Sequence, residues 1–306
     1  MKKLHISVMP EETISALNIN PCGVYIDCTF GAGGHSNLIL EKLNTNGQLI
    51  AFDQDLKAVK DSENIIKDQR FKIFHSNFNN LKVQILKHFS SEFLVDGIFF
   101  DLGVSSMQLD QADRGFSFMQ DGPLDMRMNQ NNTLLAKDVV NTFSEKKLAD
   151  IFWNYGDEKA SKKIAKAIID YRVKKQFTTT LELAELCKKI IPMAEHKHSA
   201  TRVFQALRIF VNNEISIIED SLKQAFSLLK KDGTLAVLTF HSTEDKIVKN
   251  YFKKLTTKSQ INPWPMPQVY KDAQAIFVEK MAKPKFIEIK ENIRSRSAVL
   301  RGIKKC

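Results

Sequence analysis

The sequence feature that most constrains the fold is a regular alternation of short apolar runs with stretches of helical periodicity. Four apolar runs follow one another about 25 residues apart in the first hundred residues, at 24–30, 49–53, 71–74 and 95–101. Each run ends in a Gly-rich or polar turn, and the stretches between the runs carry apolar residues at helical spacing. Parallel strands joined by crossover helices have this pattern. The sequence therefore predicts an α/β fold with a doubly wound parallel sheet.

A long interval separates the fourth run from the next convincing strand, Thr234–Phe240. It covers the 131 residues from 102 to 232, whereas a βαβ crossover needs only about 30, and long loops without secondary structure are uncommon in compact domains. We therefore expect a separate helical domain within this interval. The predicted organisation is a sheet domain formed by residues 1–106 and 213–306, with a helical insertion at 107–212.

Caps and periodicity place the remaining elements. Helices are expected at 143–153, 160–174, 181–191 and 199–211, and a further helix that starts at 215 is expected to end at Gly233. The Thr179-x-x-Glu182 pattern is a capping box for the third of these helices. Ser242 with Asp245 is expected to cap the helix that follows the strand at 234–240. Two short strands, 275–278 and 297–300, would extend the sheet.

The composition is that of an ordinary globular protein, with 43% hydrophobic and 26% charged residues. No apolar run approaches the length that spans a bilayer, and the N-terminus has no apolar segment typical of a secretory signal. We therefore expect a cytoplasmic protein. The cysteines form no C-x-x-C pair and the histidines form no ligand cluster, so we expect no metal site. We interpret the four cysteines, Cys22, Cys28, Cys187 and Cys306, as buried or incidental thiols.

The formal net charge of +10 is concentrated in two segments. Residues 283–306 contain eight Lys or Arg and two Glu, and residues 159–175 contain seven Lys or Arg and one Asp. Clustered positive charge favours a polyanionic partner. The alternative interpretation of each segment is a solvated helix face or tail.

A glycine-rich turn and two acids suggest a cofactor site. Gly31, Gly33 and Gly34 lie where the first strand turns into the first helix, so a ligand can approach the backbone closely. The G-x-G-G spacing differs from the dinucleotide fingerprint. Asp27 at the strand end would repel a diphosphate, and Asp53 at the end of the second strand could accept both hydroxyls of a ribose. The pattern favours S-adenosylmethionine over NAD, with simple loop capping by both acids as the alternative.

Asp101 ends the fourth strand and precedes Gly103-Val104-Ser105-Ser106. In a methyltransferase sheet, this edge faces the sulfonium group of the methyl donor. Asp101 could therefore contact the cofactor or accept a proton-bearing nitrogen of the methyl acceptor. Its alternative role is an Asx turn.

The sequence closely resembles a family, the bacterial 16S ribosomal RNA cytosine-N4 methyltransferases known as MraW or RsmH. The resemblance covers essentially the whole chain and its most specific motifs are PLDMRM and RSRSAVLR. The motifs that carry it are GAGGHS (31–36), DLGVSS (101–106), QLD (108–110), RGFSF (114–118), PLDMRM (123–128), WNYGDE (153–158), ATRVFQALRI (200–209), FHS (240–242) and RSRSAVLR (294–301).

The resemblance implies a class I methyltransferase domain, Rossmann-like and interrupted by a helical domain. It also implies methylation of a cytidine in 16S rRNA, cytosine 1402 in the family, within the small ribosomal subunit. By motif match, the S-adenosylmethionine contacts are Gly33, Gly34, His35, Asp53, Phe78, Asp101 and Gln108. The departures from the family pattern are expected to alter loop rigidity and not activity: Met107, Asp113, Thr239, Thr243 and Ile293.

For the reaction, we take Asp101 as the catalytic residue that polarises the N4–H bond of the cytosine. The candidate RNA phosphate contacts are Arg294, Arg296 and Arg301 in the basic tail and Lys162, Lys163 and Lys166 in the insertion. Three other functions remain open from the residues alone. They are a methyltransferase acting on a protein or small molecule, an RNA-binding ribosome-assembly factor with a vestigial cofactor site, and an NAD oxidoreductase.

Overall fold

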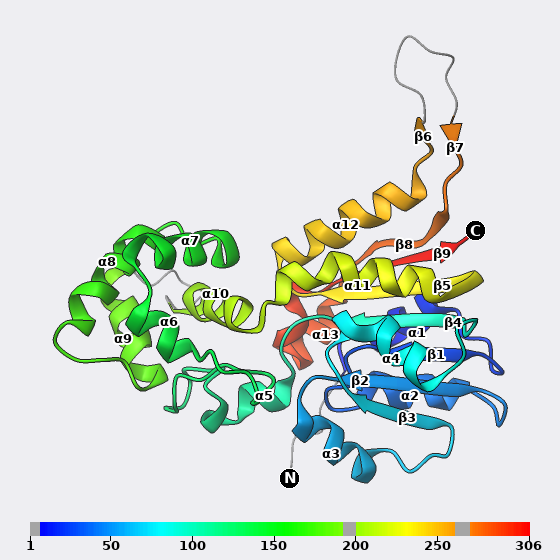
Figure 1. Ribbon diagram of the computed structural model, residues 1–306, viewed down its shortest axis with the longest axis horizontal. Coiled ribbons are helices and arrows are strands. Elements are labelled where there is room, and N and C mark those ends of the chain that lie inside the picture. Colours follow the sequence, from blue (N-terminus) through cyan, green and yellow to red (C-terminus); the bar gives the residue numbers. More distant parts are fainter. Residues whose placement is uncertain (1–6, 192–199, 261–269) are drawn as a thin grey trace. The chain divides into compact units, whose positions relative to one another are not determined.

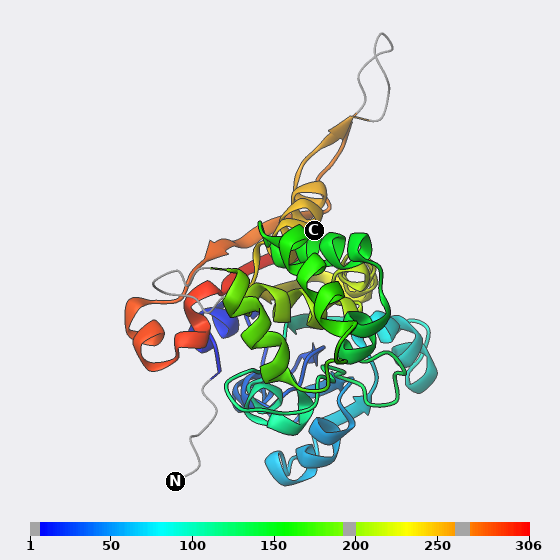
Figure 2. The same cartoon turned by 90° about the vertical axis from the view of Figure 1, so that its left-hand side faces the viewer.

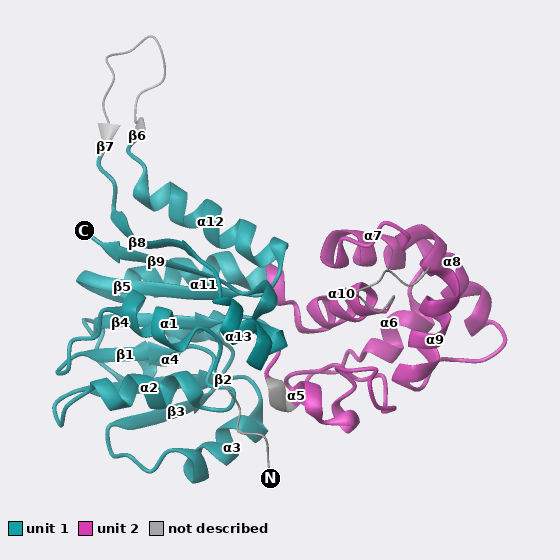
Figure 3. Cartoon of the chain, turned by 180° about the vertical axis from the view of Figure 1, so that it is seen from behind, with its two compact units in different colours: residues 1–103, 216–306 teal, residues 104–215 magenta. Residues whose placement is uncertain are grey.

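The computed structural model describes residues 7–191, 200–260 and 270–306 and divides into two compact units (Figure 3). The sheet unit comprises residues 1–103 and 216–306, and the helical unit comprises residues 104–215. The sequence placed the insertion at 107–212, three residues inside each of these boundaries. Each unit has its own apolar core.

Within the described residues, the sheet unit contains a seven-stranded sheet (Figure 1) with the order β3-β2-β1-β4-β5-β9-β8. Neighbouring strands are parallel from β3 to β5, and β9 runs antiparallel to both β5 and β8. The expected α/β doubly wound sheet is confirmed, with antiparallel strands at one edge. The strands are β1 Val24–Asp27, β2 Gln48–Asp53, β3 Phe71–His75, β4 Val95–Asp101, β5 Leu229–Thr239, β8 Ala275–Ala282 and β9 Val299–Lys305.

Helices cover both faces of this sheet. Consecutive residues of β4, Ile98 to Phe100, are all buried, because alternate side chains of a strand point to opposite faces and both faces are covered. Figure 3 shows α1 and α2 on the near face, and Figure 1 shows α11 and α12 on the other. The helices are α1 Pro10–Leu17, α2 Gly34–Lys42, α3 Leu56–Ile65, α4 Leu81–His88, α11 Glu214–Leu228, α12 Ser242–Thr256 and α13 Phe286–Glu291, with 3₁₀ turns η1 Phe78–Asn80 and η3 Ile293–Ser297.

Two short segments extend the sheet unit. The strands β6 Ser259–Gln260 and β7 Tyr270–Lys271 form an antiparallel pair after α12 (Figure 2). At the other end of the unit, α13 lies beside the N-terminal end of α1, where the Met9 N–H donates a 2.8 Å hydrogen bond to Glu288.

Two sequence predictions about helix ends were wrong. The helix expected to reach Gly233 ends at Leu228, because Leu229 is fully buried and already pairs with Val95 of β4. The cap of α12 is His241 with Glu244, one residue before the predicted pair. His241 accepts from the Glu244 N–H, and the Glu244 carboxylate accepts from the Phe240 N–H. Asp245 is instead engaged by Arg301.

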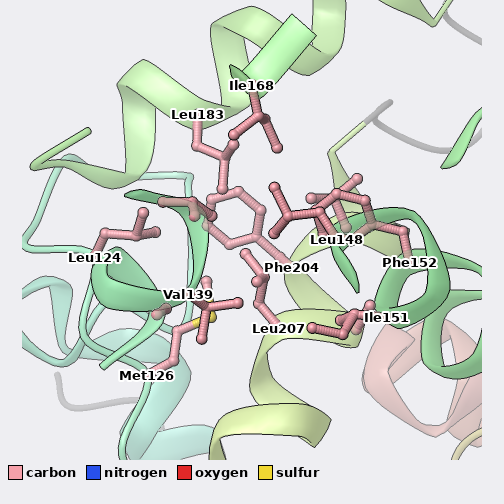
Figure 4. Packing of buried hydrophobic residues seen from close by; sticks show 14 of the residues in the cluster. Leu124, Met126, Val139, Leu148, Ile151, Phe152, Ile168, Leu183, Phe204 and Leu207 are labelled. Carbon is pink, nitrogen blue, oxygen red and sulfur yellow. The ribbon is translucent and has the colours of Figure 1, made fainter. Parts of the chain in front are cut away.

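The helical unit is built around one apolar cluster (Figure 4). Phe204 and Leu207 of α10 meet Leu148 of α7, Ile168 of α8 and Leu183 of α9, and all five are buried. The predicted capping box Thr179/Glu182 is confirmed at the start of α9. The helices of this unit are α5 Ser106–Asp110, α6 Ala136–Thr142, α7 Glu145–Gly156, α8 Ser161–Arg172, α9 Thr180–Ile190 and α10 Thr201–Asn212, with the 3₁₀ turn η2 Ala112–Arg114.

The PLDMRM segment is held in the helical unit by a buried amide. The Asn212 side chain accepts from the Met128 N–H at 2.7 Å and donates to the carbonyl oxygens of Met126 at 2.7 Å and Arg208 at 2.9 Å. Arg114, itself buried, donates to the Met128 carbonyl at 3.0 Å. These bonds let Met126 hold a left-handed conformation, with φ of +63°.

The described residues contain no helix that is long and apolar enough to cross a membrane. All four cysteines are free, Cys28 and Cys187 buried and Cys22 and Cys306 exposed, in agreement with the sequence interpretation. Among the described residues, no cluster of His, Cys, Asp and Glu has the arrangement of a metal site.

Asn212→Leu should destabilise the protein by about 2 to 5 kcal/mol, because it removes the partners of several buried backbone groups. Chemical denaturation measures this loss. Asn154→Leu, at an exposed position of α7, is the matched control and should change stability by less than about 0.5 kcal/mol. Equal stabilities of the two variants would contradict the role assigned to Asn212.

Candidate active site

Parallel pairing brings three carboxylates to one edge of the sheet unit. Asp27, Asp53 and Asp101 are the last residues of β1, β2 and β4. The β1 strand lies between the other two, with Asp27 opposite Ala51 on one side and Phe99 on the other. Carboxyl ends of adjacent parallel strands share an edge, and ligands of such sheets bind there.

Asp27 stabilises the glycine-rich turn through hydrogen bonds. It is 1% exposed, and its carboxylate accepts hydrogen bonds from the Ser36 hydroxyl at 2.7 Å and the Thr29 N–H at 3.0 Å. Burial raises the pKa of Asp27 above its ordinary value, although both hydrogen bonds act in the opposite direction. The residue therefore fixes the turn between β1 and α2.

The turn itself depends on glycine. Gly33 has φ of +78° and an added Cβ would lie 2.8 Å from the ring of Phe30 and 2.9 Å from Ile65. Gly31 also has a positive φ, of +55°. Gly34 is the first residue of α2. Gly33 and Gly34 therefore carry no side chain at the start of this helix, so a ligand can approach the backbone closely there. The Gly33 N–H itself donates to the Phe30 carbonyl oxygen at 2.8 Å.

Asp53 joins this turn to the end of β2. Its carboxylate accepts hydrogen bonds from the N–H groups of Gly31 at 2.7 Å and Asp55 at 2.8 Å. Burial raises the pKa of Asp53 to about 6, against the effect of these two bonds. Each carboxylate oxygen has a second lone pair, so two further donors can be accepted at this position.

Asp101 has a buried oxygen without a partner. Its backbone N–H donates to the Thr29 hydroxyl at 2.6 Å, and its Oδ2 lies 3.5 Å from His35 Nδ1. Its Oδ1 is buried and accepts no hydrogen bond. Since an unsatisfied buried acceptor is costly, this oxygen is a natural position for a donor supplied by a ligand.

The hydrogen-bond partners of His35 define its protonation. His35 Nε2 lies 2.9 Å from the Val8 carbonyl oxygen, which can only accept, so Nε2 carries a proton. Nδ1 then faces the carboxylate of Asp101 and is best satisfied as a second N–H. Burial lowers the pKa of His35, but the hydrogen bond to Asp101 and the charges of Asp101 and Asp27 outweigh it, so the pKa is raised. Both ring nitrogens of His35 thus face acceptor oxygens, an arrangement that favours the protonated imidazolium beside Asp101.

Two other expected cofactor contacts have partners of their own. Phe78, in η1, packs edge to face on Phe100 of β4 with ring centroids 5.6 Å apart. Gln108 belongs to the helical unit, where it is buried and its Oε1 accepts from the Ser105 N–H in the capping box of α5. The structure brings Gly33, His35, Asp53 and Asp101 together in the sheet unit.

The candidate phosphate contacts divide into two groups. Arg301 was predicted wrongly, since it is 5% exposed in β9 and forms a bidentate ion pair with Asp245 at 2.7 and 3.0 Å. The other five candidates have exposed side chains: Arg294 and Arg296 in η3, and Lys162, Lys163 and Lys166 in α8. The three lysines lie opposite the buried face of α8 formed by Ile164, Ala165 and Ile168.

Sequence reasoning missed the side chains that hold the acids in place. Thr29 links Asp27 to Asp101, Ser36 reaches Asp27, and the Val8 carbonyl fixes His35. A weak sequence signal exists for Ser36. The apolar residues after the glycine-rich turn have helical spacing, and this predicts a helix whose first turn contains Ser36 and begins close to Asp27. No sequence signal identifies Val8, since only its backbone takes part.

The known proteins most informative about this chain are methyltransferases. A model of the MraW methylase family matches residues 2–306. The chain is 46% identical over 310 residues to the ribosomal RNA small subunit methyltransferase H of Clostridium botulinum (strain Loch Maree), with both chains covered in full. It is 44% identical over 309 residues to the Mycoplasma mycoides protein of the same name, with 98% of this chain and 99% of the relative covered.

A solved structure of a methyltransferase from Streptococcus mutans in complex with SAH is also similar. It is 12% identical with a TM-score of 0.44, and the match covers 99% of this chain and all of the other. A likeness at this level adds nothing to the strand order described above.

The affinity for S-adenosylhomocysteine should depend on the ionisation of Asp53. Hydroxyl donors of a ribose bind the carboxylate and not the acid, so protons compete with the ligand below the pKa of about 6. The dissociation constant should be constant above about pH 7 and rise up to about tenfold per pH unit below about pH 6. Isothermal titration calorimetry measures it.

Asp53→Asn is the control, since Asp27 and His35 titrate in both proteins. This variant should bind more weakly near neutral pH and lose the part of the pH dependence that Asp53 supplies. An affinity of the unmodified chain that stays flat between about pH 8 and pH 5 would contradict the role of Asp53.

Proposed function

Because the chain belongs to the MraW methylase family, we propose that it methylates the exocyclic N4 of a cytidine in the 16S RNA of the small ribosomal subunit. The substrate base in this proposal is cytosine 1402. The observation that carries the proposal is the buried, unpartnered Oδ1 of Asp101 beside the glycine-rich turn. The names of the relatives support the RNA substrate, and the acceptor atom is inferred from the chemistry of the site.

The methyl donor of the family is S-adenosylmethionine. When bound, it supplies a methyl group on a positively charged sulfur. The edge described above suits this donor, because Asp53 can accept ribose hydroxyls, Gly33 and Gly34 leave the backbone accessible, and the acids favour a cation over a diphosphate. We assign Gly33, Gly34, His35, Asp53, Phe78, Asp101 and Gln108 to donor binding, with His35 acting through its backbone since its ring is already engaged.

The chain's task in the reaction is to orient a poor nucleophile. The lone pair of cytosine N4 is delocalised into the ring, so N4 must be held in line with the methyl group and kept from water. In our proposal, Asp101 Oδ1 accepts a hydrogen bond from N4–H, which returns electron density to N4, and takes up the proton released when the N–C bond forms. The His35 imidazolium keeps Asp101 oriented from the opposite oxygen.

A base inside folded RNA must leave its stack to reach such a site. In our proposal, the phosphates around the extruded base are held by Arg294 and Arg296 of η3 and by the exposed lysines of α8. These side chains are solvent-accessible, and the proposed RNA partner accounts for the clustering of positive charge in both segments.

Methylation of ribosomal RNA tests the proposed function directly. Small ribosomal subunits from cells that lack this protein are incubated with the purified protein and S-adenosylmethionine, and the RNA is digested and mapped by mass spectrometry. One N4-methylated cytidine should appear, at cytosine 1402. No methylation, or methylation at another atom or base, would contradict the proposal.

Asp101→Asn should lower turnover by about 100-fold or more, because the amide cannot take up the N4 proton. Its affinity for S-adenosylhomocysteine should fall far less than its turnover, which calorimetry checks on the same preparation. The exposed Asp110→Asn, in the neighbouring QLD motif, is a matched control that should keep full turnover. Equal losses of turnover and affinity in Asp101→Asn would make Asp101 a binding residue only.

A further inference from the structure

The sheet unit exposes an aromatic and basic surface that extends beyond the two phosphate contacts proposed above, Arg294 and Arg296. Phe286 and Ile287 of α13 are each 70% exposed, and Ile293 at the start of η3 is 64% exposed. Exposed lysine and arginine side chains surround them. We call the following residues the α13 surface: Lys283, Phe286, Ile287, Lys290, Ile293, Arg294 and Arg296.

The orientation of α13 explains this exposure. The carboxylate of Glu288 faces the body of the sheet unit and accepts from the Met9 N–H at 2.8 Å. Phe286 and Lys290 are four residues apart and share one face of the helix, and the Lys290 ammonium lies 4.7 Å from the centroid of the Phe286 ring. The ring is therefore presented to solvent together with a cation.

The charge of this surface indicates a polyanion. Within residues 283–296, the exposed side chains of Lys283, Lys290, Arg294 and Arg296 are positively charged, and that of Glu291 is negatively charged. Lys285 forms ion pairs with the exposed Glu11 at 3.0 Å and with Glu12 at 3.5 Å. Proteins that bind single-stranded nucleic acid combine such cations with exposed rings on which bases stack.

Three successive contacts connect the α13 surface to the candidate active site. Asp101 contacts the His35 ring at 3.5 Å, and His35 binds the Val8 carbonyl at 2.9 Å. The next residue, Met9, binds Glu288 of α13 at 2.8 Å. All of these residues belong to the sheet unit. An RNA strand whose base reaches Asp101 would therefore have the α13 surface within a short distance.

We propose that the α13 surface binds a single-stranded RNA segment next to the methylated base, with a base stacked on Phe286. This inference rests on the proposed function, because the RNA substrate is part of that proposal.

Two other occupants of the α13 surface fit less well than RNA. The six-residue helix, about 9 Å long, is much shorter than most helices that lie on membranes. A symmetric contact with a second copy would bring the same cations together.

Binding to small ribosomal subunits from cells that lack this protein tests the inference. Phe286→Ala in the full chain should weaken binding by about 5- to 150-fold, the range for loss of one base–aromatic stack. Phe286→Tyr keeps a stacking ring and should bind like the unmodified chain. Ile287→Ala is the matched control, because Ile287 is equally exposed but cannot stack, and it should weaken binding by less than about threefold. Filter binding measures all four proteins.

Several outcomes would overturn the inference. One is that Phe286→Ala binds the subunits as tightly as the unmodified chain. Another is that Ile287→Ala loses as much affinity as Phe286→Ala, which would indicate apolar docking without stacking. Binding to vesicles of anionic phospholipid, or a dimer in sedimentation, that Phe286→Ala abolishes would also overturn it. If the unmodified chain methylates the subunits while Phe286→Ala binds normally, only this inference fails. If the unmodified chain neither binds nor methylates them, the proposed function fails.

Discussion

The parallel pairing of β1 with β2 and β4 is the constraint on which the site depends. It places the carboxylates of Asp27, Asp53 and Asp101 at one edge of the sheet, and burial there raises the pKa of Asp27 and of Asp53. The surrounding groups compensate the cost of burial in three ways. Asp27 is bonded within the turn, Asp53 accepts two backbone N–H groups, and Asp101 Oδ2 lies 3.5 Å from the His35 ring. One acceptor, Asp101 Oδ1, is left over, and it marks where a donor from a ligand would bind.

The sequence predicted this edge because the chemistry of parallel sheets is local. Each apolar run ends in an acid or a turn, so Asp27, Asp53 and Asp101 were expected at the strand ends, and the long interval before Thr234 predicted the helical insertion. The errors have a common physical origin in tertiary pairing. Leu229 enters the sheet earlier than helical periodicity indicates, because it pairs with Val95. The sequence predicts that Arg301 is a solvent-exposed cation in a basic tail, but Arg301 lies in β9 and forms an ion pair with Asp245.

Other features depend on contacts that sequence spacing does not encode. The raised pKa of His35 follows from contacts with the carbonyl of Val8, 27 residues away, and with the carboxylate of Asp101. The hydrogen bond between the Met9 N–H and Glu288 directs the Glu288 face of α13 toward the sheet unit, so that Phe286 is exposed to solvent. Gln108 was expected at the cofactor from its motif, and its side chain also caps α5. A motif therefore identifies candidate functional residues. The structure then shows which of their side chains stabilise a local segment, as that of Gln108 does in α5.

The central claim is that this edge holds a methyl donor against an acceptor nitrogen at Asp101. A crystal structure of the protein with S-adenosylhomocysteine and cytidine tests it most directly. The account predicts ribose hydroxyls at Asp53, the amino-acid part of the ligand along Gly33 and Gly34, and cytosine N4 hydrogen-bonded to Asp101 Oδ1. A structure in which the ligand lies elsewhere, or in which Oδ1 still lacks a partner with both ligands bound, would contradict the account.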